Sequence, residues 1–320
     1  MTPVSAEQRG RDIAPVVSLY PVEPAFLVDA IRQGGCTVAA LNGTSRGLVV
    51  TDGVPPYELV ELLSRHPGLE WVQLPSAGVE SFLPAVRSAA GARLTWTSAK
   101  GAYAQPVAEH AVALSLALLR ILHRRARTTS WSTVPEGTTL AGLDVVVVGA
   151  GGIGVEIVRL LNVFGADITV VRRRPEAVPG AKLTVGTDRL IDVLASADLV
   201  ILAAALTDST SGLLGAAELA ALKPGANIVN IARGGLIDTD ALLVALRHGQ
   251  VAGAALDVTE PEPLPDGHAL WDEPGVLITP HSADTPEMTK PLLAERVRIN
   301  AAALHNRGAL TGVVDAGAGY

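Results

Sequence analysis

A run of four valines that leads into a glycine-rich loop constrains the fold of this chain more than any other segment. Val145–Val148 has the composition of a buried strand, Gly149-Ala150-Gly151-Gly152-Ile153-Gly154 follows it directly, and Val155–Leu161 has the apolar pattern of a helix. In such a strand–turn–helix unit the first glycine permits a tight turn, the second lets a phosphate approach the backbone, and the third lets the helix pack on the strand. The segment therefore predicts a dinucleotide site with its pyrophosphate at a helix N-terminus, with a purely structural glycine turn as the alternative.

Short apolar runs alternate with helical patterns along the chain, which is typical of an α/β fold with parallel sheets. Strands are expected at Val16–Tyr20, Thr37–Leu41, Leu48–Thr51, Trp71–Leu74, Leu94–Thr97, Asp144–Val148, Asp167–Val171, Leu199–Ala203, Ile228–Ile231, Ala252–Asp257 and Val276–Thr279. Helices are expected at Phe26–Arg32, Tyr57–Arg65, Val155–Leu161 and Met288–Ala303, and a long helix is expected from just after Pro106 to near Arg125. The strand series after the glycine loop predicts one doubly wound sheet.

Composition and charge narrow the class of protein. The chain has 320 residues, which suits two domains, and its 48% hydrophobic and 18% charged content is that of a globular protein. A net charge of −7 argues against a nucleic-acid surface, which is normally basic. The single cysteine, Cys36, allows no internal disulfide and fits a reducing cytoplasm, where it is expected to be a small buried residue.

Two segments bear on targeting. Met1–Asp12 lacks the apolar core of a signal peptide, and the apolar run Ala111–Leu122 is shorter than the ~20 residues of a membrane span. We therefore expect a cytoplasmic protein without membrane or nucleic-acid partners, and we predict no metal site.

Three arginines at the end of the next strand bear on the choice of dinucleotide. The strand Asp167–Val171 is followed by Arg172-Arg173-Arg174. An NAD site normally has Asp or Glu at this place, about 20 residues beyond the glycines, to accept hydrogen bonds from the ribose. A guanidinium instead attracts a 2′-phosphate and can bind it with two parallel hydrogen bonds. Arg172 and Arg173 therefore predict NADP(H) over NAD(H), with NAD(H) use or a merely solvated basic turn as alternatives.

A cation, a carboxylate and a histidine follow successive strands in the second half of the chain. Arg233 and His281 each come just after an expected strand, at the edge where ligands of such sheets bind. Arginine can hold a carboxylate through two charge-assisted hydrogen bonds, and histidine can exchange a proton near neutral pH. A carboxylate would orient His281, and Glu260 and Glu262 are both candidates. The other histidines lie in expected helices or loops without comparable neighbours: His66, His110, His123, His248, His268 and His305.

The order and spacing of these motifs resemble the D-isomer-specific 2-hydroxyacid dehydrogenase family over nearly the whole chain. The resemblance includes Gly149–Gly154, Leu206–Thr210, Leu222–Gly225, Asn230–Asp240, Ala254–Val258, Pro263–Pro265 and Thr279–His281. It implies a Rossmann cofactor domain, residues 106–284, inserted in a flavodoxin-like substrate domain of residues 1–105 and 285–320. It also implies a homodimer formed through the cofactor domain.

The resemblance further implies roles for single residues. Arg233 matches the arginine that binds the substrate carboxylate and carbonyl, and His281 matches the proton donor-acceptor. Glu262 matches its paired glutamate in preference to Glu260, because it lies five residues after Asp257. The backbone of Ala77 and Gly78 matches the loop that holds the substrate carboxylate, and the substrate side chain would meet Trp71, Leu74 and Tyr103. The residues implied to contact the cofactor are Gly149, Gly151, Ile153, Gly154, Arg172, Arg173, Ala204, Ile231, Ala232, Asp257 and Ala283.

Departures from the family pattern bear on the cofactor contacts, and the sequence does not name the substrate. Arg172 replaces the usual acid, as in the NADP-using glyoxylate and hydroxypyruvate reductase branches. Ala203 and Ala205 stand where many members have histidine and proline, and Asp284 stands where a small residue is common. We expect hydride transfer between NADP(H) and a small 2-keto or D-2-hydroxy acid. One alternative is an NAD-dependent phosphoglycerate dehydrogenase, although the long forms carry an extra domain and this chain ends at Tyr320. The other is a nucleotide-sensing corepressor-like protein.

Overall fold

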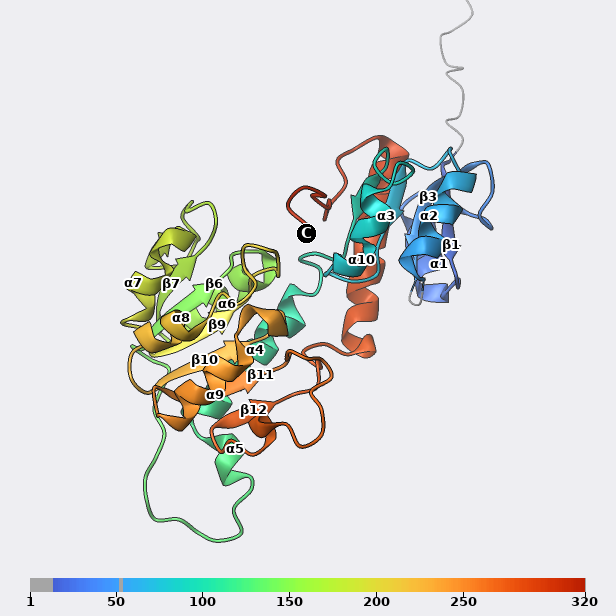
Figure 1. Cartoon of the computed structure of the whole chain (residues 1–320). Helices are drawn as coiled ribbons and strands as arrows, with labels where there is room; N and C mark the ends of the chain where they lie inside the picture. Colours follow the sequence, from blue (N-terminus) through green and yellow to red (C-terminus); the bar gives the residue numbers. More distant parts are fainter. Residues whose placement is uncertain (1–13, 52–53, 320) are drawn as a thin grey trace, which may run out of the picture. The chain divides into compact units, whose positions relative to one another are not determined.

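The chain folds into two compact α/β units (Figure 1). The structure, a computed structural model, describes residues 14–51 and 54–319. Unit 1 consists of the residues up to Lys100 together with the segment that starts at Lys290, and unit 2, Gly101–Thr289, is inserted between them. These divisions were predicted after residues 105 and 284. The segment Met1–Asp12, for which no signal peptide was expected, lies outside the described residues.

Unit 1 is built on a five-stranded parallel sheet with the order β2-β1-β3-β4-β5. This order is that of the flavodoxin-like doubly wound fold, as predicted. Its strands are β1 (Val16–Tyr20), β2 (Thr37–Val38), β3 (Ser45–Val50), β4 (Trp71–Gln73) and β5 (Thr95–Thr97). Its helical segments are α1 (Ala25–Gln33), α2 (Pro56–Arg65), η1 (Glu80–Phe82), α3 (Leu83–Arg87) and most of α10 (Pro286–Asn306).

The core of unit 1 takes up two residues that were expected to meet substrate. Leu74 is fully buried in an apolar cluster with Leu59 and Leu63 of α2. Trp71 is also fully buried, and its indole N–H donates to Thr97 Oγ1 at 2.7 Å. That expectation is therefore corrected for Trp71 and Leu74, because alternate residues of a buried strand point into the core on one face or the other.

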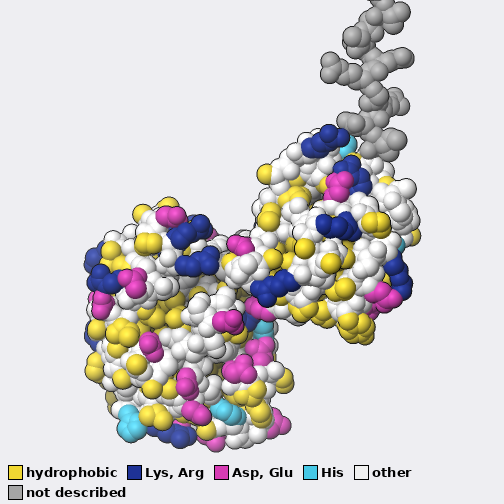
Figure 2. All heavy atoms as spheres, turned by 45° about the horizontal axis from the view of Figure 1, so that its top comes forward, with side chains coloured by type: hydrophobic (Ala, Val, Ile, Leu, Met, Phe, Trp, Pro, Cys, Tyr) yellow, Lys and Arg dark blue, Asp and Glu magenta, His cyan; other side chains and the backbone are white. Residues whose placement is uncertain are grey.

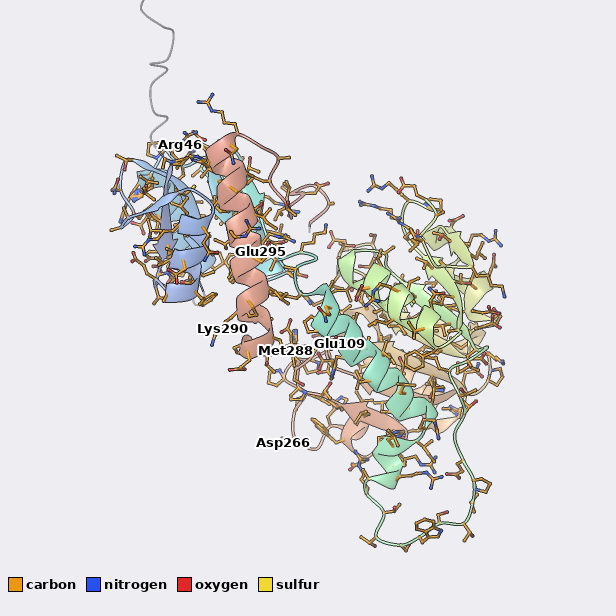
Figure 3. The ribbon with its side chains drawn as sticks, turned by 180° about the vertical axis from the view of Figure 1, so that it is seen from behind. Arg46, Glu109, Asp266, Met288, Lys290 and Glu295 are labelled. Atoms are coloured by element: carbon orange, nitrogen blue, oxygen red, sulfur yellow. The ribbon has the colours of Figure 1, made fainter. Side chains whose placement is uncertain are left out.

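Helix α10 is fixed to unit 1 by buried polar groups as well as by apolar contacts. Asn300 Nδ2 donates to Gln73 Oε1 at 2.9 Å, and the Arg296 guanidinium donates to the carbonyl oxygens of Ser98 and Lys100, both at 2.9 Å. Buried polar groups of this kind require hydrogen-bond partners, and here they receive them from β4 and from the segment after β5. Figure 3 labels Met288, Lys290 and Glu295 along this helix.

Unit 2 is built on a seven-stranded parallel sheet with the order β12-β11-β10-β9-β6-β7-β8. The chain reverses its direction of winding between β6 and β9, as in a Rossmann fold. The strands are β6 (Asp144–Val148), β7 (Asp167–Val171), β8 (Leu183–Val185), β9 (Leu199–Leu202), β10 (Ala226–Asn230), β11 (Val251–Leu256) and β12 (Val276–Ile278). The short edge strand β8 was not predicted; the other strands were, and the α/β class with two doubly wound units is confirmed.

The helices of unit 2 flank this sheet. They are α4 (Ala104–Leu119), α5 (Leu122–Arg125), α6 (Gly152–Val163), α7 (Leu190–Leu194), α8 (Ala216–Ala221) and α9 (Thr239–Arg247), with 3-10 turns η2 (Thr187–Arg189), η3 (Gly234–Leu236) and η4 (Ala269–Trp271). Helix α4 packs against α6, β10 and β11. The strand residues Val146, Val200 and Ile228 belong to an apolar cluster with residues of α7, α8 and α9.

The expected long helix after Pro106 is in fact two helices. Helix α4 already begins at Ala104, because proline is tolerated in a first helical turn, where its missing N–H has no acceptor. It ends at Leu119, since Ile121 has a left-handed φ of 47°. The returning chain pairs there, with Thr138 N donating to Leu119 O at 2.8 Å. A pattern of apolar residues does not reveal such a break.

Surface charge is mixed on the face shown in Figure 2, where Lys and Arg side chains lie among Asp and Glu side chains. Within residues 14–51 and 54–319, no helix is both long and apolar enough to cross a membrane. The same residues contain no group of three His, Cys, Asp or Glu side chains arranged to hold a metal ion.

Candidate active site

The glycine loop between β6 and α6 has the backbone geometry of a phosphate-binding turn. Gly149 has a φ of +105°, and a Cβ added to it would lie 2.5 Å from Ala203 O. A Cβ on Gly154 would lie 2.1 Å from Gly149 O, so only glycine allows α6 to start this close to β6. Around Gly151, the residue that caps α6, there is open space instead. The loop therefore fits a dinucleotide whose pyrophosphate meets the first N–H groups of α6.

Arg172 follows β7 and already has a partner. Its Nη2 lies 3.4 Å from Glu176 Oε2, and its Nη1 donates to Glu176 O at 3.4 Å. The Arg172 side chain is half-buried, whereas Arg173 and Glu176 are exposed. A guanidinium therefore occupies the position where an NAD site has a carboxylate, with an exposed carboxylate at its side.

The remaining residues predicted to line the cofactor lie in loops after strands of the same sheet or, for Ile153, in the first turn of α6. Ile231, Ala232 and Ala283 are buried, with 6%, 9% and 8% of their surface exposed, and Ile153 and Ala204 are half-buried. These loops follow β6, β9, β10 and β12, whose carboxyl ends lie at one edge of the sheet.

The same edge carries the residues predicted to act on the substrate. Arg233 follows β10, Asp257 follows β11 and His281 follows β12, and these three strands are parallel neighbours. Arg233 is half-buried; its Nη1 donates to Ala232 O at 2.7 Å, and its own carbonyl accepts from Asn230 Nδ2 at 2.8 Å. The sheet thus holds the backbone of Arg233 in a fixed place beside the loops that carry Asp257 and His281.

His281 and Glu262 form a close pair. His281 Nδ1 lies 2.6 Å from Glu262 Oε1, and both side chains are partly exposed. The backbone of His281 is left-handed, with a φ of 50°, and its N–H donates to Asp257 O at 2.8 Å. With Nδ1 facing the carboxylate, Nε2 is the ring atom left to exchange a proton with a ligand.

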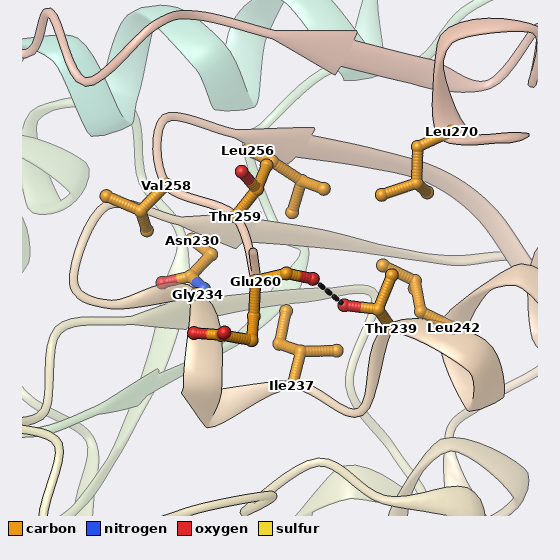
Figure 4. Close-up of a pocket in the computed structure, with 10 residues that line it drawn as sticks. All are labelled: Asn230, Gly234, Ile237, Thr239, Leu242, Leu256, Val258, Thr259, Glu260 and Leu270. Carbon is orange, nitrogen blue, oxygen red and sulfur yellow. Dashed lines mark hydrogen bonds between the residues drawn. The ribbon is translucent and has the colours of Figure 1, made fainter. Parts of the chain in front are cut away.

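The structure separates the two glutamates that the sequence left as candidates. Glu260 instead lines a small cavity in unit 2, where its backbone carbonyl accepts from Thr239 Oγ1 at 3.0 Å (Figure 4). The cavity there, lined also by Asn230 and Gly234, has a volume of about 10 Å³, enough for about one water molecule. Glu262 is therefore the glutamate that pairs with His281.

Asp257 organises the turn after His281. Its Oδ1 accepts from Thr279 Oγ1 at 2.6 Å and from Ser282 N at 2.9 Å, and its Oδ2 accepts from Ala283 N at 3.1 Å. Burial opposes ionisation of this carboxyl, but hydrogen bonds from His110, Thr279 and Ser282 outweigh it and lower the pKa of Asp257. The side chain is 1% exposed, so the role that the geometry gives it is to hold this turn.

Replacing Asp257 by asparagine is expected to destabilise the fold by about 1–3 kcal/mol near neutral pH, because an amide N–H₂ would face a backbone N–H. In the folded state the pKa of Asp257 lies below its ordinary value of 3.8. Ionised Asp257 therefore stabilises the fold fully above about pH 3.8, and this stabilisation is lost as the pH falls through the lowered pKa. Urea unfolding of the native protein and the D257N variant at about pH 7 and about pH 3 tests this. A deficit that is equal at both pH values would contradict it.

His110 is a site residue that the sequence analysis missed. It was grouped with the ordinary histidines, but its Nε2 lies 3.0 Å from Thr279 Oγ1 and 3.3 Å from Asp257 Oδ1. Its helix, α4, is distant in sequence from both partners, so no local motif signals the contact. The one signal in the sequence is the apolar run Ala111–Leu122 directly after His110, since a helix of this composition is typically buried against other elements.

Two other predicted positions can be placed. Asp284 follows this turn, and burial raises its pKa, while nearby His281 opposes the shift. In unit 1, Ser76 Oγ donates to Gly78 O at 2.6 Å, which shapes the half-buried loop of Ala77 and Gly78 after β4. Substrate binding by this loop stays a prediction.

Comparisons with known proteins agree with this geometry. The sequence model of the "D-isomer specific 2-hydroxyacid dehydrogenase, NAD binding domain" matches residues 112–283. An uncharacterized protein of the proB 3′ region of Corynebacterium melassecola is 37% identical over 79% of this chain and 84% of its own length. Glyoxylate/hydroxypyruvate reductase A of Photorhabdus laumondii is 31% identical over 83% of this chain and 85% of its own length.

A solved structure and a longer relative complete the comparison. The D-isomer specific 2-hydroxyacid dehydrogenase of Xanthobacter autotrophicus, solved with NADPH and MES, has a TM-score of 0.82 and 27% identity, covering 96% of this chain and all of that one. D-3-phosphoglycerate dehydrogenase of Bacillus subtilis is 39% identical over 56% of this chain, but the match spans only 35% of that enzyme.

A Rossmann sheet with a glycine loop, and a histidine–carboxylate pair at the same sheet edge, define a dinucleotide-dependent oxidoreductase. The chain belongs to the D-isomer specific 2-hydroxyacid dehydrogenase family, whose members are NAD(P)-dependent enzymes.

Proposed function

We propose that this protein reduces a small 2-keto acid, of the size of glyoxylate or hydroxypyruvate, to the 2-hydroxy acid with NADPH. The observation that carries the proposal is the 2.6 Å pair of His281 Nδ1 and Glu262 Oε1 at the sheet edge that also bears Arg233. The similarity to the Photorhabdus laumondii reductase supports the substrate class.

Each residue of this set has a distinct task in the proposed reaction. The Arg233 guanidinium holds the substrate carboxylate through two hydrogen bonds and stabilises negative charge that develops on the carbonyl oxygen. Glu262 orients the His281 ring and stabilises its protonated form. Nε2 of His281 then donates a proton to the developing alkoxide. A reduced nicotinamide, when bound, supplies the hydride.

Two features support NADPH as the preferred cofactor. Arg172 stands at the end of β7 where a carboxylate would repel a 2′-phosphate, and Arg173 follows it on the exposed side. The Xanthobacter autotrophicus relative was solved with NADPH.

Glu176 is expected to weaken NADPH binding, because its carboxylate lies 3.4 Å from Arg172 Nη2 and competes with a 2′-phosphate. Replacing Glu176 by glutamine should tighten NADPH binding by about twofold to fivefold, the range for an exposed ion pair. NADH binding should be unchanged. Fluorescence titration with both nucleotides measures this, and weaker NADPH binding or an equal gain for NADH would refute the competition.

A substrate panel tests the proposed function. Purified protein is given NADPH or NADH with glyoxylate, hydroxypyruvate, pyruvate and 3-phosphohydroxypyruvate, and oxidation of the nucleotide is followed. We expect turnover with glyoxylate or hydroxypyruvate and higher kcat/KM with NADPH. Preference for the phosphorylated acid with NADH would instead identify a phosphoglycerate dehydrogenase-like activity. Stoichiometric nucleotide binding without any turnover would favour a nucleotide-sensing protein.

We also propose a homodimer formed through unit 2. The family resemblance supports it, as do the exposed apolar side chains of Leu122, Trp131 and Val134, which lie between α4 and β6 and are 52%, 93% and 58% exposed. Light scattering on the purified protein should give twice the chain mass of 33.0 kDa. A mass equal to that of one chain would contradict the dimer.

A further inference from the structure

His110 lies at one end of a hydrogen-bond network whose other end is the backbone beside His281. Its Nε2 is 3.0 Å from Thr279 Oγ1 and 3.3 Å from Asp257 Oδ1. Thr279 precedes His281 by two residues. Asp257 accepts from the N–H groups of Ser282 and Ala283, the two residues that follow His281. The network therefore contacts the chain on both sides of the histidine.

The distances define which atom carries each proton. Thr279 Oγ1 has one hydrogen, and its 2.6 Å contact with Asp257 Oδ1 requires that hydrogen to point at the carboxylate. Thr279 Oγ1 can then only accept from His110, so the proton of His110 lies on Nε2. That N–H faces both Thr279 Oγ1 and Asp257 Oδ1. Helix α4 therefore supplies the Asp257 carboxylate with a donor in addition to those from the segment Thr279–Ala283.

The turn that this network holds is locally unfavourable. His281 has a φ of 50°, a left-handed conformation that residues other than glycine rarely adopt. Asp257 stabilises the turn through Ser282 N and Ala283 N, and donors, His110 among them, lower the pKa of its carboxyl against the opposing effect of burial. Loss of the His110 donor leaves a buried carboxylate with fewer hydrogen bonds and a less restrained turn.

We propose that His110 is a positioning residue for this turn: from α4, through Asp257 and Thr279, it fixes the backbone on both sides of His281. The consequence for catalysis rests on the proposed role of His281 as proton donor. The consequence for the turn itself does not, since it concerns only the hydrogen bonds of Ser282 and Ala283.

Two readouts separate these consequences. Hydrogen exchange at the amides of Ser282 and Ala283 reports the turn directly, and kcat with the best 2-keto acid reports catalysis. In the His110→Leu variant we expect the exchange at these amides to be about tenfold faster. We expect kcat to fall about tenfold to a hundredfold, because small displacements of a catalytic group carry costs of this size.

Conservative variants distinguish a positioning role from mere packing. In His110→Gln the side-chain amide can donate from nearly the position of Nε2, so exchange and kcat should return to within about threefold of the native values. Thr279→Val, which removes the bridging hydroxyl, should behave like His110→Leu, and the double variant should be no worse than either single one. Glu109→Gln is the matched control, since Glu109 is an exposed neighbour on α4 (Figure 3) whose Oε1 accepts from Gln105 Nε2 of the same helix.

The outcomes decide the matter in each case. Unchanged amide exchange in His110→Leu overturns the proposal, as does a glutamine variant no better than the leucine variant. If His110→Leu does not fold, the glutamine and Thr279→Val variants carry the test. If the native protein turns over no 2-keto acid, the proposed function fails, and amide exchange alone still decides whether His110 holds the turn.

Discussion

Replacing His281 by alanine is expected to lower kcat by about a thousandfold, within the range for loss of a general acid. In the proposed mechanism the pair of His281 and Glu262 supplies the proton in the reducing direction, whereas Nε2 of His110, the other histidine beside this turn, faces Thr279 and Asp257. The Kd for NADPH should stay within about twofold, because the glycine loop and Arg172 follow other strands of the sheet. Steady-state kinetics and fluorescence titration on the same preparation measure both quantities.

A control histidine makes this result specific. His248 at the end of α9 is exposed, and its Nδ1 lies 2.9 Å from Val244 O of its own helix, so His248→Ala should keep native kcat. If His281→Ala retains more than about a tenth of the native kcat, another group donates the proton and the assignment of His281 is wrong. If NADPH binding falls in parallel with kcat, His281 serves the cofactor rather than the proton transfer.

Replacing Arg172 by alanine is expected to raise the Kd for NADPH by about tenfold to a hundredfold, which corresponds to the loss of a charge-assisted pair with the 2′-phosphate. The Kd for NADH should change by less than about threefold, because NADH has a hydroxyl at that place. Raising the salt concentration should weaken NADPH binding to the native protein and have little effect on the variant.

Arg189 provides the control for this variant. It is exposed in the same unit and pairs with Asp192, so Arg189→Ala removes an equal charge outside the predicted nucleotide site. Equal losses for NADPH and NADH in Arg172→Ala would show that Arg172 supports the loop rather than the phosphate. Similar losses in both arginine variants would show a general effect of charge.

Much of the fold was predictable because it depends on local patterns. The valine run of β6 and the strand β7 were predicted with the bounds that the structure has, since buried strands of a parallel sheet are continuous apolar runs. β8 was missed because it has only three residues, lies at the sheet edge and is partly exposed. The end of α4 was missed because Ile121 reverses the backbone without glycine or proline.

The site was predictable to the extent that its residues follow strands. Arg233, Asp257 and His281 were found in this way, but the sequence left Glu260 beside Glu262, and the distance to His281 Nδ1 distinguishes them. His110 could not be found, since its contact with Asp257 arises only when α4 packs under β10 and β11. Contacts between elements remote in sequence are set by packing, which single-sequence patterns do not encode.

The most direct test of the central claim is isotope transfer in a single turnover. NADPH deuterated on the transferable face of nicotinamide C4 is mixed with excess protein and glyoxylate, and the product is examined by NMR. The account predicts glycolate that carries the deuterium on the carbon of the former keto group, with transfer strongly slowed in His281→Ala. Glycolate without deuterium, or bound NADPH that is never oxidised by any 2-keto acid, would contradict it.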